Sequence, residues 1–409
     1  MPNAIFNIEK YPEKTITRKD NSHSYSIRFY GEKSKQEQMA MISHCFHNKE
    51  IVSYTEMAEA KVYLQEYIRS LKHDIPEEDI DLLCENPFQL ELFREWDNVP
   101  FHTASNPKFR FIDLFAGIGG IRIPFNELGG KCVFSSEWDS AACRTYASNF
   151  GEVPFGDITK IDASFIPSHD ILLAGFPCQA FSIMGKMRGF EDTRGTMFFE
   201  VARILAHHHP KAILLENVKQ LVGHDKGKTF KVILETLAEL GYHVKWKVLN
   251  ALDFGVPQKR ERVIIVGFLD KQAAETFNFE FKKVPYSLSD ILDKETDVDP
   301  KLIASDTIRE KRRNSVLGKD VFYPSIWHEN KSGNISVLPY ACALRTGASY
   351  NYLLVNGLRR PTSRELLRLQ GFPENFRIVV PHSEIRRQTG NSVAVPMIRA
   401  VANKIVKLI

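Results

Sequence analysis

Short apolar runs recur through the middle of the chain, and each one ends in a polar or glycine-rich turn. Amphipathic stretches at 196–207 and 229–240 separate some of these runs and predict helices. The apolar runs predict buried strands within 109–120, 131–136, 171–174, 211–215 and 263–268. An alternation of strands and helices is typical of an α/β fold built on a parallel sheet.

The pattern differs on both sides of this region. Residues 1–105 are charged and irregular, although apolar residues at helical spacing predict a helix over 57–71, and Pro76 has the features of a second helix start. Either a structural extension or a partner-binding module is compatible with this region. From 285 to 357 the strand–helix rhythm is lost, and Thr362 or Ser363 then caps a short helix. A C-terminal amphipathic helix follows Pro396.

Candidate ligand-binding residues follow the predicted strands. The turn after the first strand contains Gly117, Gly119 and Gly120, but a dinucleotide fingerprint also requires glycine at 122, where Arg122 stands, so NAD is disfavoured.

Glu137 lies 20 positions after Gly117, where nucleoside-binding units place an acid for ribose hydroxyls. Trp138 lies at the end of the second strand. Asp157 lies at the end of a third strand, which we expect to end at Phe155. Together these residues suggest a nucleoside pocket, although each alone is an ordinary core, cap or surface residue.

Two further strand ends carry reactive side chains. Cys178 follows the strand at 171–174, and a glycine-punctuated loop to Gly195 comes after it. Glu216 follows the next strand, where burial would raise its pKa and make it a proton donor. The ordinary alternatives are a buried cysteine and a capping acid. The run that contains Arg260 and Arg262 is either a solvated charge cluster or a site for phosphate or carbonyl groups.

Composition adds limits to this picture. The chain has 409 residues, of which 43% are hydrophobic and 25% charged, as in soluble globular proteins. It has no apolar run of membrane-spanning length and no signal pattern at its start, so we expect a cytoplasmic protein. None of the six cysteines forms a Cys-x-x-Cys pair, and we read His207–His209 as surface residues, so we expect no metal site. The net charge of +4 permits nucleic-acid binding without indicating it.

Nine ordered stretches together resemble the bacterial DNA cytosine-5 methyltransferases of restriction-modification systems. They span residues 109–409, about three quarters of the chain. The stretches are FIDLFAGIGGIR, SSEWD, GDIT, GFPCQAFS, RGTMFF, LLENVK, GVPQKRERVIIVGF, RRPTSRELLRLQGFP and QTGNSVAVP.

The resemblance implies a doubly wound α/β domain that binds S-adenosylmethionine, formed by 106–285 and 384–409. It also implies a small target-recognition domain and hinge at 286–383, while 1–105 is an N-terminal extension outside the family core. Glu137 would hold the ribose hydroxyls and Asp157 the adenine amino group. The implied cofactor residues are Phe115, Ile118, Gly119, Glu137, Trp138, Asp157, Ile158, Pro177, Met197 and Asn391.

The resemblance also implies covalent catalysis on a flipped-out cytosine in double-stranded DNA. Cys178 would attack carbon 6 of the ring, Glu216 would bond N3 and the exocyclic amine, and Arg262 would hold the ring carbonyl. Arg260 would face the phosphates or the loop. The expected DNA contacts are Gln179, Ser182 and Arg345.

The resemblance further implies a monomer that is paired with a restriction endonuclease. An RNA cytosine-5 methyltransferase of the same fold is one alternative, although such relatives typically show a different loop after the cysteine. A non-catalytic DNA-binding regulator is another. Loss of Cys178 or Glu216 would mark such a regulator, and both residues are present.

Overall fold

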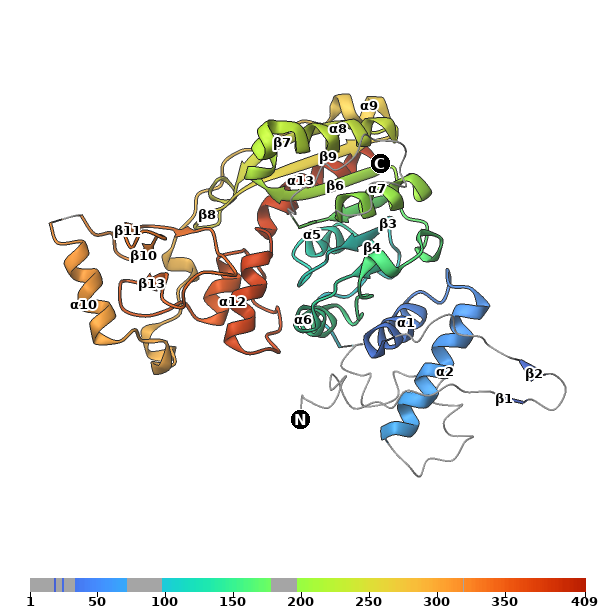
Figure 1. Ribbon diagram of the computed structural model, residues 1–409, viewed down its shortest axis with the longest axis horizontal. Helices are drawn as coiled ribbons and strands as arrows, with labels where there is room; N and C mark the ends of the chain where they lie inside the picture. Colours follow the sequence, from blue (N-terminus) through green and yellow to red (C-terminus); the bar gives the residue numbers. More distant parts are fainter. Residues whose placement is uncertain (1–17, 20–23, 26–33, 72–97, 178–196, 319) are drawn as a thin grey trace.

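The computed structural model shows a large lobe, a smaller lobe beside it, and a helical hairpin at the far side of the large lobe (Figure 1). The structure describes residues 18–19, 24–25, 34–71, 98–177, 197–318 and 320–409. In that part of the chain, no helix is long and apolar enough to cross a membrane.

A six-stranded sheet forms the centre of the large lobe, in the order β4-β3-β5-β6-β9-β7. Strands β4, β3, β5 and β6 are parallel, and β9 is antiparallel to both of its neighbours. The carboxyl ends of the four parallel strands therefore meet at one edge, where α/β sheets bind ligands. The strands are β3 (Phe109–Leu114), β4 (Gly130–Ser136), β5 (Ile171–Ala174), β6 (Ala212–Val218), β7 (His243–Asn250) and β9 (Glu261–Phe268).

Helices cover both faces of the sheet, as the predicted doubly wound fold requires. On β5, Leu172 and Ala174 face the helices α7 and α8, whereas Ile171 and Leu173 face α5, α9 and α13, because successive strand residues point to opposite faces. The C-terminal helix thus packs on the same sheet as residues far earlier in the chain. These helices are α5 (Arg122–Glu127), α7 (Met197–His208), α8 (Lys228–Glu239), α9 (Lys271–Thr276) and α13 (Val395–Ile405).

Two expectations about strands need correction. The strand expected to end at Phe155 is only a single β-bridge to Ser136, followed by a 3₁₀ turn at Ile158–Lys160. Pro154 has no N–H to donate to a ladder, which limits pairing here. The edge strand β7 was not predicted, although Val244, Trp246 and Val248 alternate with lysines along it.

The small lobe has a three-stranded antiparallel sheet in the order β11-β10-β13. Its short helix α11 was predicted: the Thr362 side chain accepts the Glu365 N–H, and the Glu365 carboxylate accepts the Thr362 N–H. Strand β12 (Ala341–Cys342) pairs with β8 (Gln258–Lys259), which connects this lobe to the large one. Helix α6 (Ser140–Phe150) shares an apolar cluster with α11 and α12. The remaining elements are α10 (Asp306–Ser315), β10 (Ile326–Glu329), β11 (Ile335–Leu338), β13 (Leu353–Val355), α11 (Ser363–Arg368) and α12 (His382–Asn391).

Two helices, α1 (Lys35–His47) and α2 (Tyr54–Leu71), form a hairpin that packs on the large lobe beside β4 (Figure 1). The helix predicted over 57–71 is confirmed as part of α2, whereas α1 was not predicted. The start predicted at Pro76 lies outside the described residues, and the two-residue strands β1 (Arg18–Lys19) and β2 (Ser24–Tyr25) pair with each other. Apolar side chains of the hairpin join those of the sheet in one core, which favours a structural extension over an independent module.

Candidate active site

A cleft of about 720 Å³ lies at the carboxyl edge of the parallel strands, within the range of small-molecule sites. The ends of β3, β4, β5 and β6 contribute to it, together with the end of α12. The cleft brings together most of the residues predicted for the cofactor and the catalytic site. Those on its lining are Phe115, Ile118, Glu137, Trp138, Asp157, Ile158, Pro177, Met197, Glu216, Arg260, Arg262 and Asn391.

The glycine-rich turn after β3 is shaped by backbone conformations that favour glycine. Gly117 has a φ of 56°, and its N–H donates to Glu137 Oε2 at 2.8 Å. Gly119 has a φ of 81°, and a Cβ there would collide with the ring of Phe150. Gly119 is not among the described residues that line the cleft, so its role is to let the turn pack against α6.

Glu137 and Trp138 form the wall at the end of β4. The second carboxylate oxygen of Glu137 accepts the N–H of Asp139 at 2.9 Å, and burial raises the pKa of this carboxyl group. The indole of Trp138 is 80% exposed. An aromatic ring that stays exposed at the mouth of a cleft is suited to stacking on a flat ligand.

Helix α12 holds this wall from the side of the small lobe. The Arg387 guanidinium donates to both carboxylate oxygens of Asp139, at 2.6 and 2.8 Å. Gln388 accepts from the Thr145 hydroxyl and donates to the Ala141 carbonyl, so α12 is fastened to α6. Arg387 and Gln388 were not predicted from the sequence, since nothing in their spacing relates them to helix α6 and its N-cap, 243–248 positions earlier.

Glu216 and Arg262 form an ion pair inside the cleft. Arg262 Nε lies 2.9 Å from Glu216 Oε1, and the side chain of Glu216 is 10% exposed. The antiparallel register of β6 and β9 produces this pair. Arg262, near the start of β9, lies opposite Val218 at the end of β6, two residues after Glu216, so Glu216 and Arg262 lie at the same edge of the sheet. Burial raises the pKa of Glu216 despite the opposing effect of Arg262 and Arg260. A buried acid with a raised pKa in a cleft is suited to donate a proton or a hydrogen bond.

Arg260 lines the cleft, and its hydrogen bonds go to backbone carbonyls. Its guanidinium is buried and donates to the carbonyls of Leu344, Gly390 and Ser392. Leu344 belongs to the small lobe, Gly390 to the last turn of α12, and Ser392 directly follows that helix. Through these three bonds Arg260 connects the large lobe to the small lobe and to the end of α12, whereas its buried Nε has no hydrogen-bond partner among the described residues. A contact of Arg260 with the phosphates or the loop stays a prediction.

Asn217 holds the chain where it leaves β5. Its side-chain amide donates to the carbonyl of Phe176 at 2.8 Å, and its oxygen accepts the N–H of Val218. Phe176 precedes Pro177, which lines the cleft. The sequence reasoning assigned no role to Asn217, although its place beside Glu216 at a strand end was a usable signal. Cys178, Gln179 and Ser182 lie outside the described residues.

The family profile described as C-5 cytosine-specific DNA methylase matches residues 109–407. The chain belongs to this family. As a C-5 cytosine-specific DNA methylase, it is an enzyme that methylates cytosine in DNA, which confirms the resemblance seen in its motifs.

Relatives of this methylase include two bacterial proteins at 59% identity. One is the Type II methyltransferase M.NgoBI of Neisseria gonorrhoeae, over 71% of this chain and 91% of that protein. The other is the Type II methyltransferase M.HaeII of Haemophilus aegyptius, over 73% of this chain and 93% of that protein. In both matches, more than a quarter of the methylase lies outside the aligned region.

Solved structures share the fold of the methylase. The Dnmt2 methyltransferase of S. pombe superposes with a TM-score of 0.55 at 21% identity, over 74% of this chain and 99% of that one. The methyltransferase EhMeth of Entamoeba histolytica gives a TM-score of 0.58 at 18% identity, over 74% and 99%. At these identities the likeness concerns the fold, and it confirms the predicted fold class.

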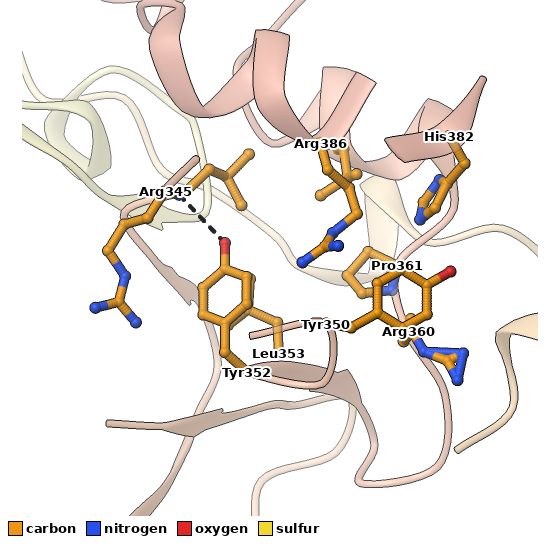
Figure 2. Close-up of a pocket in the computed structure, with 10 residues that line it drawn as sticks. Arg345, Tyr350, Tyr352, Leu353, Arg360, Pro361, His382 and Arg386 are labelled. Atoms are coloured by element: carbon orange, nitrogen blue, oxygen red, sulfur yellow. Dashed lines mark hydrogen bonds between the residues drawn. The ribbon is translucent and has the colours of Figure 1, made fainter. Parts of the chain in front are cut away.

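Arg345 of the methylase is not among the described residues that line the cleft. Figure 2 shows it at a second, small pocket of the small lobe, where its N–H donates to the Tyr352 hydroxyl at 3.3 Å. In the same pocket the ring of Tyr350 is contacted by the guanidinium groups of Arg360 and Arg386, at 4.3 and 4.6 Å (Figure 2). The backbone of Arg345 also abuts Gly390, which lines the cleft. A DNA contact by Arg345 stays a prediction.

Proposed function

We propose that this enzyme transfers the methyl group of S-adenosylmethionine to carbon 5 of a flipped-out cytosine in a short, specific duplex DNA site, through a covalent adduct with Cys178. We also propose that this modification protects DNA from a cognate restriction endonuclease, since relatives at 59% identity bear the name Type II methyltransferase. The observation that carries the proposal is the Glu216–Arg262 pair, which shares one cleft with Glu137 and Trp138. The same cleft therefore contains Glu216 and Arg262, which can bind a pyrimidine ring, and the Glu137–Trp138 wall, which can bind a nucleoside.

The residues of the wall fit the cofactor. Each Glu137 carboxylate oxygen accepts one backbone N–H and has a further lone pair for a ribose hydroxyl. Trp138 offers an exposed ring for the adenine, and Asp157 lies on the same lining. S-adenosylmethionine would supply the methyl group as an electrophilic sulfonium. The remaining predicted cofactor residues on the lining are Phe115, Ile118, Ile158, Pro177, Met197 and Asn391.

Glu216 and Arg262, together with Cys178, are suited to activate a cytosine ring for methyl transfer. The Cys178 thiolate would add to carbon 6, and the ring electrons would move toward N3. Glu216, whose pKa is raised by burial, would donate to N3, and Arg262 would hold the ring carbonyl. Electron density at carbon 5 would then form the bond to the methyl group, while the methyl–sulfur bond would break and S-adenosylhomocysteine would leave. Loss of the carbon 5 proton to water would restore the double bond and expel Cys178.

The small lobe would carry target recognition. A base in a duplex is out of reach of the cleft, so the target nucleotide would rotate out of the stack. Gln179, Ser182 and Arg345 are the proposed DNA contacts, and one protomer would act on one site. In this proposal residues 106–285 and 384–409 form the catalytic domain, and 286–383 the recognition domain and hinge.

The proposal is tested by incubating the full chain with tritiated S-adenosylmethionine and either duplex DNA or tRNA. Label in DNA cytosine and none in tRNA is expected, and bisulfite sequencing of the product then locates the methylated site. Label in tRNA alone, or label at another position of the DNA bases, would contradict the proposal.

A further inference from the structure

The first turn of α1 reaches the back of the wall that carries Glu137 and Trp138. The Gln36 side-chain nitrogen, Nε2, lies 3.0 Å from the Glu137 carbonyl oxygen and 3.4 Å from that of Pro154. It also lies 3.0 Å from Cys143 Sγ on α6. Because carbonyl oxygens only accept hydrogen bonds, the amide nitrogen of Gln36 must face this group. One side chain of the N-terminal extension therefore joins three separate segments of the catalytic lobe.

These segments support residues that line the cleft. Glu137 precedes Trp138, and its carbonyl also accepts the thiol of Cys143 at 3.2 Å. Pro154 lies three residues before Asp157, and between them a Cβ at Gly156 would lie 4.0 Å from Glu37 of α1. The backbone bearing Trp138 and the backbone bearing Asp157 are thus joined from behind by the first turn of α1.

The hairpin is a firm support, since its own anchoring is extensive. The ring of His44 is buried against Phe155 and Phe165, with ring centroids at 5.5 and 6.0 Å. The Ser43 hydroxyl accepts the N–H of Val153 at 3.0 Å. Farther along, Lys131 of β4 donates to the carbonyl of His47 at 2.9 Å. A hairpin held at several points on the segment 153–165 and on β4 cannot shift without moving the wall.

We propose that the N-terminal hairpin forms the outer support of the cofactor pocket, and that Gln36 is a positioning residue for the Glu137–Trp138 wall. Removing the Gln36 amide leaves the carbonyls of Glu137 and Pro154 without this donor. The backbone bridge between Ser136 and Phe155 still joins the two segments, but their outer parts gain freedom to move. Cofactor binding must then restrict this motion, so affinity for the cofactor falls. The Glu216–Arg262 pair lies on other strand ends, so the chemical step is unaffected.

The inference rests on the proposed cofactor, and its test uses the full chain with the substitution Gln36→Ala. Calorimetric titration with S-adenosylhomocysteine should show a Kd about tenfold higher than that of the unaltered chain. The KM for S-adenosylmethionine should rise to the same extent, whereas kcat and the KM for DNA stay within about twofold. A purely structural defect would lower kcat through loss of active enzyme and would leave this KM unchanged.

The matched control is Ser53→Ala, which removes the N-terminal cap of α2. Ser53 accepts the N–H of Glu56 at 3.2 Å and is not among the residues that line the cleft, so the control weakens the start of α2 and leaves every contact between α1 and the wall in place. The inference is overturned if Gln36→Ala binds S-adenosylhomocysteine like the unaltered chain, or if both variants lose affinity equally. Failure of the unaltered chain to bind S-adenosylhomocysteine would instead refute the cofactor assignment itself.

Discussion

The interiors of the two lobes are stabilised in different ways. In the large lobe, strands β5, β6 and β9 consist mainly of apolar residues with almost no exposure, packed between helices. The distal core of the small lobe is a cluster of only five buried apolar residues with two partly buried ones. Beside it, Arg359 pairs with the fully buried carboxylate of Glu365, at 2.8 and 2.9 Å, and Arg312 pairs with Glu329.

The difference in core composition matches the different roles proposed for the two lobes. An apolar sheet core is a rigid base on which strand ends hold catalytic groups in place. A buried ion pair such as Arg359–Glu365 depends on geometry, since removal of one partner leaves a desolvated charge behind. We therefore expect the chemistry and the integrity of the small lobe to be separable by mutation.

The largest effect is expected for Cys178→Ala. The substitution removes the proposed nucleophile, so methyl transfer should fall to background while DNA and S-adenosylhomocysteine binding persist. Filter assays with tritiated S-adenosylmethionine measure turnover, and gel shifts measure DNA binding. Measurable turnover by this variant would remove Cys178 from the mechanism.

Glu216→Gln should slow methyl transfer by about 10²- to 10⁴-fold without unfolding the chain. The amide retains the shape of the carboxyl group but cannot donate a proton to N3. Single-turnover kinetics with saturating cofactor and DNA measure the effect. A rate within about threefold of the unaltered enzyme would show that the raised pKa of Glu216 has no catalytic use.

Arg359→Met should affect the small lobe alone. It leaves the carboxylate of Glu365, with 0% side-chain exposure, without its main cation, and this should cost about 3–5 kcal/mol in unfolding free energy. The matched control is Arg399→Met on the large lobe, which breaks an ion pair with Glu127 that is about one-third exposed and should cost less than about 1 kcal/mol. DNA binding should be lost in the first variant while S-adenosylhomocysteine binding is kept. Equal denaturation midpoints for the two variants would contradict the contrast between the lobes.

A further effect concerns how the stability of the large lobe depends on pH. Burial raises the pKa of Asp113 from its ordinary value of 3.8 to about 8, so the folded state holds a proton that the unfolded chain releases. The stability contributed by this proton is complete below about pH 4 and is lost as the pH rises toward 8, by at most about 1.4 kcal/mol per pH unit. Asp113→Asn should remove this part of the pH dependence of the unfolding free energy. Identical pH profiles for the two proteins would show that Asp113 is ionised in the folded state.

The same contrast explains what could be predicted from the sequence. Strands β3, β4, β5, β6 and β9 were predictable because their residues follow the pattern of buried strands, and the motifs at their ends are local in sequence. The contact of Arg387 with Asp139 was not, since it joins elements 248 positions apart. The same holds for Arg260, whose basic neighbourhood left a solvated cluster, phosphate or a carbonyl open, and whose partners are three backbone carbonyls that are distant in sequence. Helix α1 was missed because residues all around it are buried, which leaves no polar face to reveal a helical period.

The central claim, a covalent bond from Cys178 to the target cytosine, can be tested by trapping the adduct. In duplex DNA made with 5-fluorocytosine, carbon 5 bears fluorine in place of the proton that must leave, so elimination of Cys178 is blocked after methyl transfer. The account predicts a protein–DNA complex that survives denaturation, requires S-adenosylmethionine, and yields a nucleotide-bearing peptide with the modification at Cys178. Absence of such a complex from DNA that is methylated when made with cytosine, or attachment at another residue, would contradict it.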